Sequence, residues 1–338
     1  MIYFDQAAAV RPAAAVLDFY RETAERAFFN QEAAHAFAYR LRRELQDAGE
    51  RLALALTGRK MHVFWGCSGT DGLHAAGYLW RQRNGAVQLS DLIHPAVGAA
   101  FAGCGSSGKN LLTVFPHVES ETGAVSGLPE DLPEGGFSLC DAIQSAGKLA
   151  VLPDADFIVI SGNKLGGMGG GALLYKEESC GRILAQYRGE HFQSRPEPAQ
   201  CLTLAYAAKL AAENLQKNEA AVRQISGFLR EKLAGMPLPG GKRVLATLPE
   251  EKASPYILHL LLPGIQTGVL VRMLGEMGVA CSAGSACAAE TTEPSRILCA
   301  MGHKKDAFSG LRLSFGPENT LAEAGEFINI FQQAVREY

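Results

Sequence analysis

The chain has 338 residues, of which 47% are hydrophobic and 20% are charged, the ordinary balance of a globular enzyme with room for two domains. A formal net charge of −3 gives no broad basic field, which argues against a nucleic-acid-binding protein. No apolar run approaches the roughly 20 residues of a membrane span, and residues 1–6 lack the features of a signal peptide. We therefore expect a cytoplasmic protein with no membrane contact.

The first predicted elements are an extended segment at residues 1–12 and helices at 13–26 and 37–56. An apolar strand at 61–65 then runs into the small polar loop Gly66-Cys-Ser-Gly-Thr-Asp-Gly72 and a helix. Strand, loop and helix in this order can bind a phosphate at the free N–H groups of the helix, here beside Gly69 and Thr70. The loop is neither a Walker loop nor a dinucleotide fingerprint, so a plain turn is the simpler reading.

Strands and helices alternate through the first half of the chain. Strands are predicted at 61–65, 86–89, 111–115, 136–140, 157–160 and 172–175, with helices at 73–80 and 94–102 between them. The alternation predicts an α/β fold whose largely parallel sheet is flanked by helices, and ligands bind such sheets beyond the carboxyl ends of the strands. Thr70, His94, Asp141 and Lys164 all lie at or just after a strand end or at a helix start, so we expect them in one site.

The second half of the chain is predicted to be α+β. Helices are expected at 202–215, 219–233, 268–277, after Pro294 and at 320–336, and strands at 256–262 and 311–315. The Gly/Pro-rich stretch 236–242 indicates a boundary. We therefore expect a large domain of residues 13–240 and a smaller domain of residues 1–12 and 241–338.

Lys164 stands at the end of one predicted strand, followed by five glycines between Gly166 and Gly171. One reading is a surface lysine in a flexible hairpin. The other is a lysine whose amine, with its pKa lowered in a confined site, bonds covalently to an aldehyde such as pyridoxal phosphate. Glycines then let the backbone pass close to a flat cofactor.

Pyridoxal phosphate requires a small set of partners. A carboxylate keeps the pyridine nitrogen protonated, donors contact the ring oxygen and the phosphate, and a flat group covers the ring. The chain offers Asp141, Gln144, Thr70 with Ser161, and His94 for these roles. Asp141 as a helix cap and His94 as a surface helix start are the alternatives.

The order of these residues resembles the cysteine desulfurases, class V relatives within the fold-type I pyridoxal phosphate enzymes. The resemblance is carried by Ile2-Tyr-Phe-Asp-Gln-Ala-Ala8, Asp141-Ala-Ile-Gln144, Ser161-Gly-Asn-Lys164, Ser282-Ala-Gly-Ser-Ala-Cys287 with Glu293-Pro-Ser295, and Leu311-Arg-Leu-Ser-Phe-Gly316 with Glu318-Asn-Thr320. These five segments occur in the family's order and run nearly from end to end of the chain.

The resemblance implies a homodimeric enzyme that removes sulfur from L-cysteine. Lys164 would anchor the cofactor, Arg312 would hold the substrate carboxylate, and Cys287 would attack the substrate sulfur to give alanine and an enzyme persulfide. The family also implies a sulfur-acceptor protein, as in iron–sulfur cluster assembly. Eight dispersed cysteines with no Cys-x-x-Cys pair argue against a zinc site, so no metal is expected.

Several positions depart from the family pattern. Asn163 replaces a histidine associated with the cofactor phosphate, Glu119 replaces an asparagine that approaches the ring oxygen or the substrate, and Pro196 stands near a threonine that reaches the neighbouring subunit's phosphate. Pyridoxal phosphate binding is still expected, with Asn163 among the cofactor-binding residues and Glu119 among the substrate-binding residues. The alternatives are a selenocysteine lyase, another class V aminotransferase, or a catalytically degenerate homologue that serves as a binding partner.

Overall fold

A computed structural model describes residues 1–108, 110–191, 195–284 and 293–338. The chain packs into two compact units. The first consists of Met1–Ala9, Val118–Val125 and Gln216–Tyr338, and the second of Val10–His117 and Ser126–Leu215. Each unit is described by itself. The domain boundaries expected at residues 12 and 240 stay a prediction.

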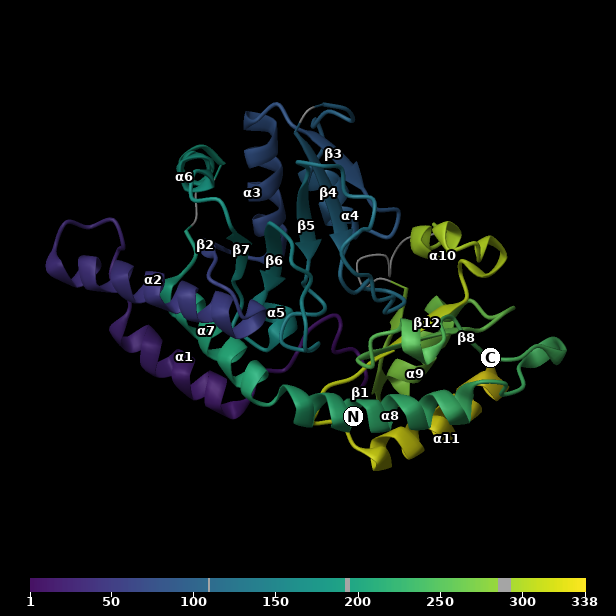
Figure 1. Ribbon diagram of the computed structural model, residues 1–338. Helices are drawn as coiled ribbons and strands as arrows, with labels where there is room; N and C mark the ends of the chain where they lie inside the picture. Colours follow the sequence, from purple (N-terminus) through teal and green to yellow (C-terminus); the bar gives the residue numbers. More distant parts are fainter. Residues whose placement is uncertain (109, 192–194, 285–292) are drawn as a thin grey trace. The chain divides into compact units, whose positions relative to one another are not determined.

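The second unit is built on a six-stranded sheet (Figure 1). Its strands, in spatial order, are β2 (His62–Gly66), β7 (Gly171–Tyr175), β6 (Phe157–Ser161), β5 (Phe137–Asp141), β4 (Leu111–Pro116) and β3 (Ala86–Leu89). Neighbouring strands from β6 to β3 are parallel, whereas β7 is antiparallel to both of its neighbours. The α/β class and the largely parallel sheet expected from the sequence are confirmed.

Alternation along the strands divides the apolar side chains of β6 between the two faces of the sheet, because successive side chains in a strand point in opposite directions. Ile158 and Ile160 pack in a core with helices α2 (Ala36–Thr57) and α7 (Pro198–Glu213). Phe157 and Val159 pack in another core with the helices of the opposite face. Those helices are α3 (Gly69–Gln82), α4 (Pro95–Ala100) and α6 (Cys180–His191), while α1 (Ala14–Arg26) packs on α7. Both faces of β6 are therefore buried, as its unbroken apolar sequence indicates.

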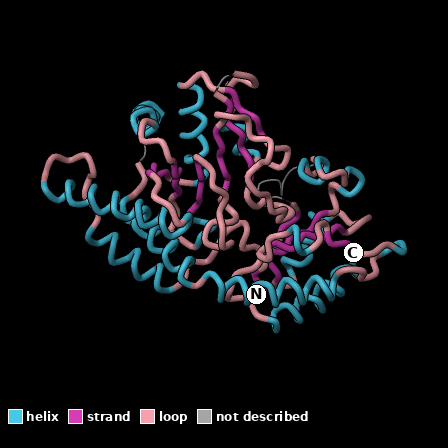
Figure 2. Tube along the Cα trace, viewed as in Figure 1, coloured by secondary structure: helices cyan, strands magenta, loops and turns pink. Residues whose placement is uncertain are grey.

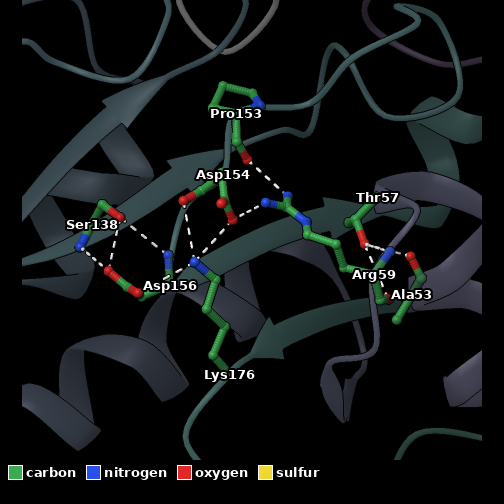
Figure 3. A network of polar contacts seen from close by, with 8 residues as sticks. All are labelled: Ala53, Thr57, Arg59, Ser138, Pro153, Asp154, Asp156 and Lys176. Carbon is green, nitrogen blue, oxygen red and sulfur yellow. Dashed lines mark hydrogen bonds and ion pairs between the residues drawn. The ribbon is translucent and has the colours of Figure 1, made fainter.

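A polar network fastens the loop before β6 to two neighbouring segments (Figure 3). The guanidinium of Arg59 pairs with the carboxylate of Asp154, whose Oδ1 also lies 2.9 Å from Nζ of Lys176. Oδ2 of Asp156 accepts hydrogen bonds from both N and Oγ of Ser138, each 2.9 Å long. The network ties β5, β6 and β7 together at one end of these strands and leaves Asp141 and Ser161 at the other end.

The first unit contains a four-stranded antiparallel sheet in the order β11 (Ser282–Ala283), β12 (Gly310–Ser314), β9 (Ile257–Leu261) and β8 (Leu245–Ala246) (Figure 2). A separate parallel pair joins β1 (Ile2–Tyr3) to β10 (Val279–Ala280). Helices α8 (Leu215–Leu233), α9 (Thr267–Glu276) and α11 (Leu321–Glu337) contribute to its core, where Phe4 packs edge-on against Phe315 and Phe327 at 5.1 and 5.5 Å. No helix in the described ranges is both long enough and apolar enough to cross a membrane.

The segment Val118–Val125 leaves the second unit after β4 and packs in the first. Val125 donates a backbone hydrogen bond to the carbonyl of Lys252, and Ala124 bridges to Ala253. The loop is buried for much of its length because it contributes to the interior of the first unit.

Candidate functional site

Lys164 lies on a one-turn helix, α5 (Gly162–Leu165), that starts where β6 ends. The sequence predicted a loop at this place. Gly166 ends the turn at a positive φ of 84°, which favours glycine. A methyl group on Gly162 would lie only 1.9 Å from the carbonyl oxygen of Gly169. The glycines therefore allow two backbone segments to touch. This contact holds the backbone of Lys164 at the end of the sheet.

Asp141 ends β5, the strand beside β6, and its carboxylate is buried. Its Oδ1 accepts a hydrogen bond of 3.0 Å from the backbone N–H of Ile143. Burial raises the pKa of Asp141 to about 6, and the Ile143 bond opposes that rise. Gln144 is also buried, and its Oε1 accepts a hydrogen bond of 3.5 Å from Nζ of Lys148. A cation beside Asp141 would relieve the cost of its buried charge.

The start of α3 is pressed against the end of β6. A methyl group on Gly69 would lie 2.8 Å from Cδ1 of Ile143 and 3.0 Å from Cβ of Ser161. Oγ of Ser68 caps the helix by accepting a hydrogen bond of 3.1 Å from the N–H of Asp71. The free N–H groups beside Gly69 and Thr70 are suited to an anion.

A cavity of about 450 Å³ opens at this helix start. It is lined by Cys67, Ser68, Thr70, Asp71, His74, Arg81 and Tyr187. Asp71 is buried there and accepts hydrogen bonds from the N–H of Cys67 at 2.8 Å and from the hydroxyl of Tyr187 at 3.1 Å. Sequence reasoning missed Asp71 and Tyr187; an acidic residue in the first turn of a helix was the available signal.

His94 caps α4, with Nδ1 accepting a hydrogen bond of 3.2 Å from the N–H of Ala96. The reading of His94 as a helix start therefore holds, and its half-buried ring is oriented by that bond. Asn163 is exposed on α5. The expected contacts of His94 and Asn163 with a cofactor stay predictions.

The second unit thus brings together Gly69 and Ser161, and it places Asp141 on the strand next to the one that leads into Lys164. These residues fit pyridoxal phosphate. The close packing at Gly69 leaves no room for a larger side chain, and the buried carboxylate of Asp141 is suited to a protonated ring nitrogen.

Arg312 lies in the first unit, on β12, and is buried. Its guanidinium donates to Oδ1 of Asp5 at 2.9 Å, to the carbonyl of Ser120 at 2.8 Å and to Oγ of Ser282 at 3.2 Å. Nε has no hydrogen-bond partner among the described residues. Asp5 and Ser282 thus fix the fork of Arg312, and its expected contact with a substrate carboxylate stays a prediction.

The carboxylate of Glu119 is turned into its own loop. Oε1 accepts from the N–H of Glu121 at 2.7 Å, and Oε2 accepts from N and Oγ1 of Thr122 at 2.6 and 2.7 Å. Sequence reasoning missed this loop-forming role. A Glu followed by Ser, Glu and Thr before a glycine is the local signal, because the side chain accepts from N–H groups two and three residues further on.

The two remaining expected residues are Cys287 and Pro196. Cys287 lies outside the described residues. Pro196 is buried, and its carbonyl accepts a hydrogen bond of 3.3 Å from Gln31. Its expected place near a neighbouring subunit's phosphate stays untested.

Comparison with known proteins identifies the family. Residues 107–327 match the family model described as aminotransferase class-V. The chain belongs to this family. Class V relatives include the NifS/IcsS protein homolog of Lactobacillus delbrueckii, which is 26% identical over all of this chain and 98% of its own length. The IscS-like cysteine desulfurase of Mycobacterium tuberculosis is also 26% identical, over 99% of this chain and 96% of its own.

Solved structures of similar proteins have the same fold as this class V chain. A NifS-like protein from Rickettsia africae superposes with a TM-score of 0.80 at 18% identity, covering 99% of both chains. The cysteine desulfurase CsdA of Escherichia coli gives 0.74 at 18% identity, covering 99% of this chain and 94% of its own. At this level of identity the likeness establishes the fold.

Proposed function

We propose that this class V protein is a pyridoxal phosphate-dependent cysteine desulfurase, which converts L-cysteine to alanine and leaves a persulfide on Cys287. The observation that carries the proposal is the arrangement at the carboxyl edge of the sheet. Buried Asp141, the glycine-supported Lys164 and the start of α3 meet there on neighbouring elements. End-to-end similarity to relatives named as cysteine desulfurases supports the choice of reaction.

The cofactor would be held by residues of the second unit. Lys164 would bind its aldehyde carbon, Asp141 its ring nitrogen, Gln144 its ring oxygen, and the α3 start with Ser161 and Asn163 its phosphate. When bound, it supplies an electron-withdrawing ring that acidifies the α-proton of an amino acid. The ring's positive charge would hold Asp141 ionised and reverse the effect of burial on its pKa.

The chain's own residues perform the remaining steps. The amine of Lys164 takes the α-proton of the substrate and delivers a proton to carbon, and the imidazole of His94 covers the site and exchanges protons at the substrate thiol. The thiolate of Cys287 attacks the substrate sulfur. An S–S bond forms as the C–S bond breaks, its electron pair goes to carbon, and a proton completes alanine. Arg312 orients the substrate through its carboxylate.

The experiment measures alanine formed from L-cysteine in the presence of pyridoxal phosphate and a thiol reductant. We expect Lys164→Ala and Cys287→Ala to abolish alanine formation, whereas Cys104→Ala, a half-buried cysteine in the second unit, retains it. Alanine formed equally by Cys287→Ala would contradict the persulfide mechanism. Selenide from selenocysteine alone, or a keto acid, would indicate another class V reaction, and no product from any amino acid tested would indicate a binding protein.

We further propose a cytoplasmic homodimer that passes its sulfur to an acceptor protein, as in iron–sulfur cluster assembly. The support is the end-to-end similarity to the named cysteine desulfurases. Light scattering on the purified protein measures the mass directly; a species near 36.1 kDa would be a monomer and would contradict the dimer.

A further inference from the structure

Glu121 is a buried carboxyl group that the proposed reaction does not use. It lies in the Val118–Val125 segment, inside the first unit. Oγ of Ser295 donates a hydrogen bond of 2.6 Å to Oε1 of Glu121. A bond this short to a carboxylate is of the stronger, charge-assisted kind.

Glu121 bonds to one flank of residues 285–292, the stretch that contains Cys287, and lies close to the other flank. On one side is Ser295. On the other is Gly284, at a φ of 68°, where a methyl group would lie 3.4 Å from Oε1 of Glu121. One buried oxygen atom therefore bonds to the chain just after the cysteine-bearing stretch and lies close to the chain just before it, although Glu121 is more than 160 residues away in sequence.

Ser295 is also the N-cap of α10 (Arg296–Ala300). Its Oγ accepts from the N–H of Leu298 at 3.1 Å while donating to Glu121, and its own N–H bonds to the carbonyl of Ala307 at 2.9 Å. A change at Glu121 would thus loosen the helix start that ends the stretch. On the other side, Ser282 on β11 is fixed by the ring of bonds around Arg312.

The charges around Glu121 come from three elements. Glu119 lies in the same segment, Arg312 is on β12, and Nε2 of His259 on β9 lies 3.9 Å from Oε1. Burial raises the pKa of Glu121 to about 7; the Ser295 bond and Arg312 oppose the rise, and Glu119 adds to it. Burial, Arg312 and His303 lower the pKa of His259 to about 3, so its ring is neutral beside Glu121 at neutral pH.

We propose that Glu121 is a positioning residue for Cys287: it anchors the flank that follows the cysteine-bearing stretch, lies beside the flank that precedes it, and changes the strength of this anchor with its own ionisation. The inference rests on the proposed function in that Cys287 is taken as the sulfur-accepting thiol. An ionised Glu121 accepts a stronger hydrogen bond from Ser295 than a protonated Glu121 does. The anchor is therefore tighter at a pH above the pKa of Glu121 than at a pH below it.

Hydrogen exchange of the amides of residues 295–300, corrected for intrinsic rates, tests the anchor without any substrate. In the natural protein we expect protection to increase as the pH rises through about 7. Glu121→Gln, which keeps an acceptor but cannot ionise, should remove this step. Glu121→Ala should speed exchange by roughly fivefold to tenfold at every pH, the effect expected from weakening one cap.

Steady-state kinetics test the effect on the reaction. We expect Glu121→Ala and Ser295→Ala to lower kcat by on the order of tenfold with little change in KM, because a misplaced nucleophile slows the chemical step. Thr320→Ala is the matched control: it removes the capping box of α11 in the same unit, which Thr320 forms with Glu323 and not with Glu121 or Ser295. It should lower the melting temperature and leave kcat unchanged.

The outcomes separate the two proposals. If the natural protein forms no alanine, the proposed function fails, and hydrogen exchange still decides whether Glu121 anchors Ser295. If alanine is formed but the Glu121 and Ser295 variants behave like Thr320→Ala in exchange and in kcat, the positioning role is wrong. A pH step in hydrogen exchange that persists in Glu121→Gln would assign the titration to another group. It would then overturn the proposal that the ionisation of Glu121 changes the strength of the anchor.

Discussion

Asp141 combines two requirements that conflict when no cofactor is bound. The proposed contact with a ring nitrogen needs a buried carboxylate, and burial penalises its charge. Because its pKa is raised from 3.8 to about 6, the folded state binds the proton more tightly than the unfolded state does. The resulting stabilisation is complete below the unfolded value and is lost as the pH rises through about 6.

We therefore expect the cofactor-free protein to lose stability between about pH 4 and about pH 6 relative to Asp141→Asn, by at most on the order of 3 kcal/mol. Urea unfolding at several pH values measures the difference, with exposed Asp131→Asn as the control. Saturation with pyridoxal phosphate should reduce the difference. Indistinguishable pH dependence in the natural protein and in Asp141→Asn would argue against a strained carboxylate.

Glu119 has a structural role in its own loop that its position in the family pattern does not indicate. Its oxygens satisfy the backbone N–H groups of Glu121 and Thr122 in a buried loop. Replacing Glu119 by Ala leaves both donors without this partner, which costs on the order of 1–3 kcal/mol for each unsatisfied group.

For Glu119→Ala we predict a loss of several kcal/mol in the free energy of unfolding, whereas Glu119→Gln should retain part of the loop through its carbonyl oxygen. Chemical denaturation measures both. Glu130→Ala, at an exposed position, is the control and should change stability little. A Glu119→Ala protein as stable as the control would mean that the loop does not depend on the carboxylate.

At the scale of elements, the close approach of α5 to the glycine loop depends on the absence of a side chain. A methyl group on Gly162 would meet the backbone oxygen of Gly169 at 1.9 Å, so Gly162→Ala must displace the chain beside Lys164. We expect a loss of roughly 1–3 kcal/mol or more in stability and weaker pyridoxal phosphate binding. Thermal unfolding and cofactor titration measure the two effects.

The matched control is Gly98→Ala in α4, where no atom lies within 4 Å of the added methyl group. In a helix interior this change should be neutral or slightly stabilising. If Gly162→Ala tolerated the methyl group as well as Gly98→Ala does, the close backbone contact would not constrain the position of Lys164.

Periodicity predicted most of the sheet because β6 and its neighbours are short, apolar and separated by turn residues. It did not predict α5, because four residues are too few to show a helical period. Family motifs led to Asp141 and Lys164, whereas Glu121 was missed because its partners Gly284 and Ser295 are distant in sequence. Long-range contacts of this kind leave no local pattern in one sequence.

At the scale of the whole molecule, each unit is completed at a different point in the chain. All strands of the six-stranded sheet lie between β2 and β7, so the second unit is complete at residue 215. The first unit requires the first nine residues, an eight-residue segment from the middle and everything from residue 216 onward.

The pairing of β1 with β10 has a consequence for synthesis on the ribosome. Val279 and Ala280, the partners of Ile2 and Tyr3, are added to the chain about 280 residues after them. At typical translation rates of about 5–20 residues per second, the first strand stays unpaired for on the order of 15–60 seconds. The unpaired strand β1 is therefore a stretch that a chaperone can bind, and a stalled chain would present it for as long as the stall lasts.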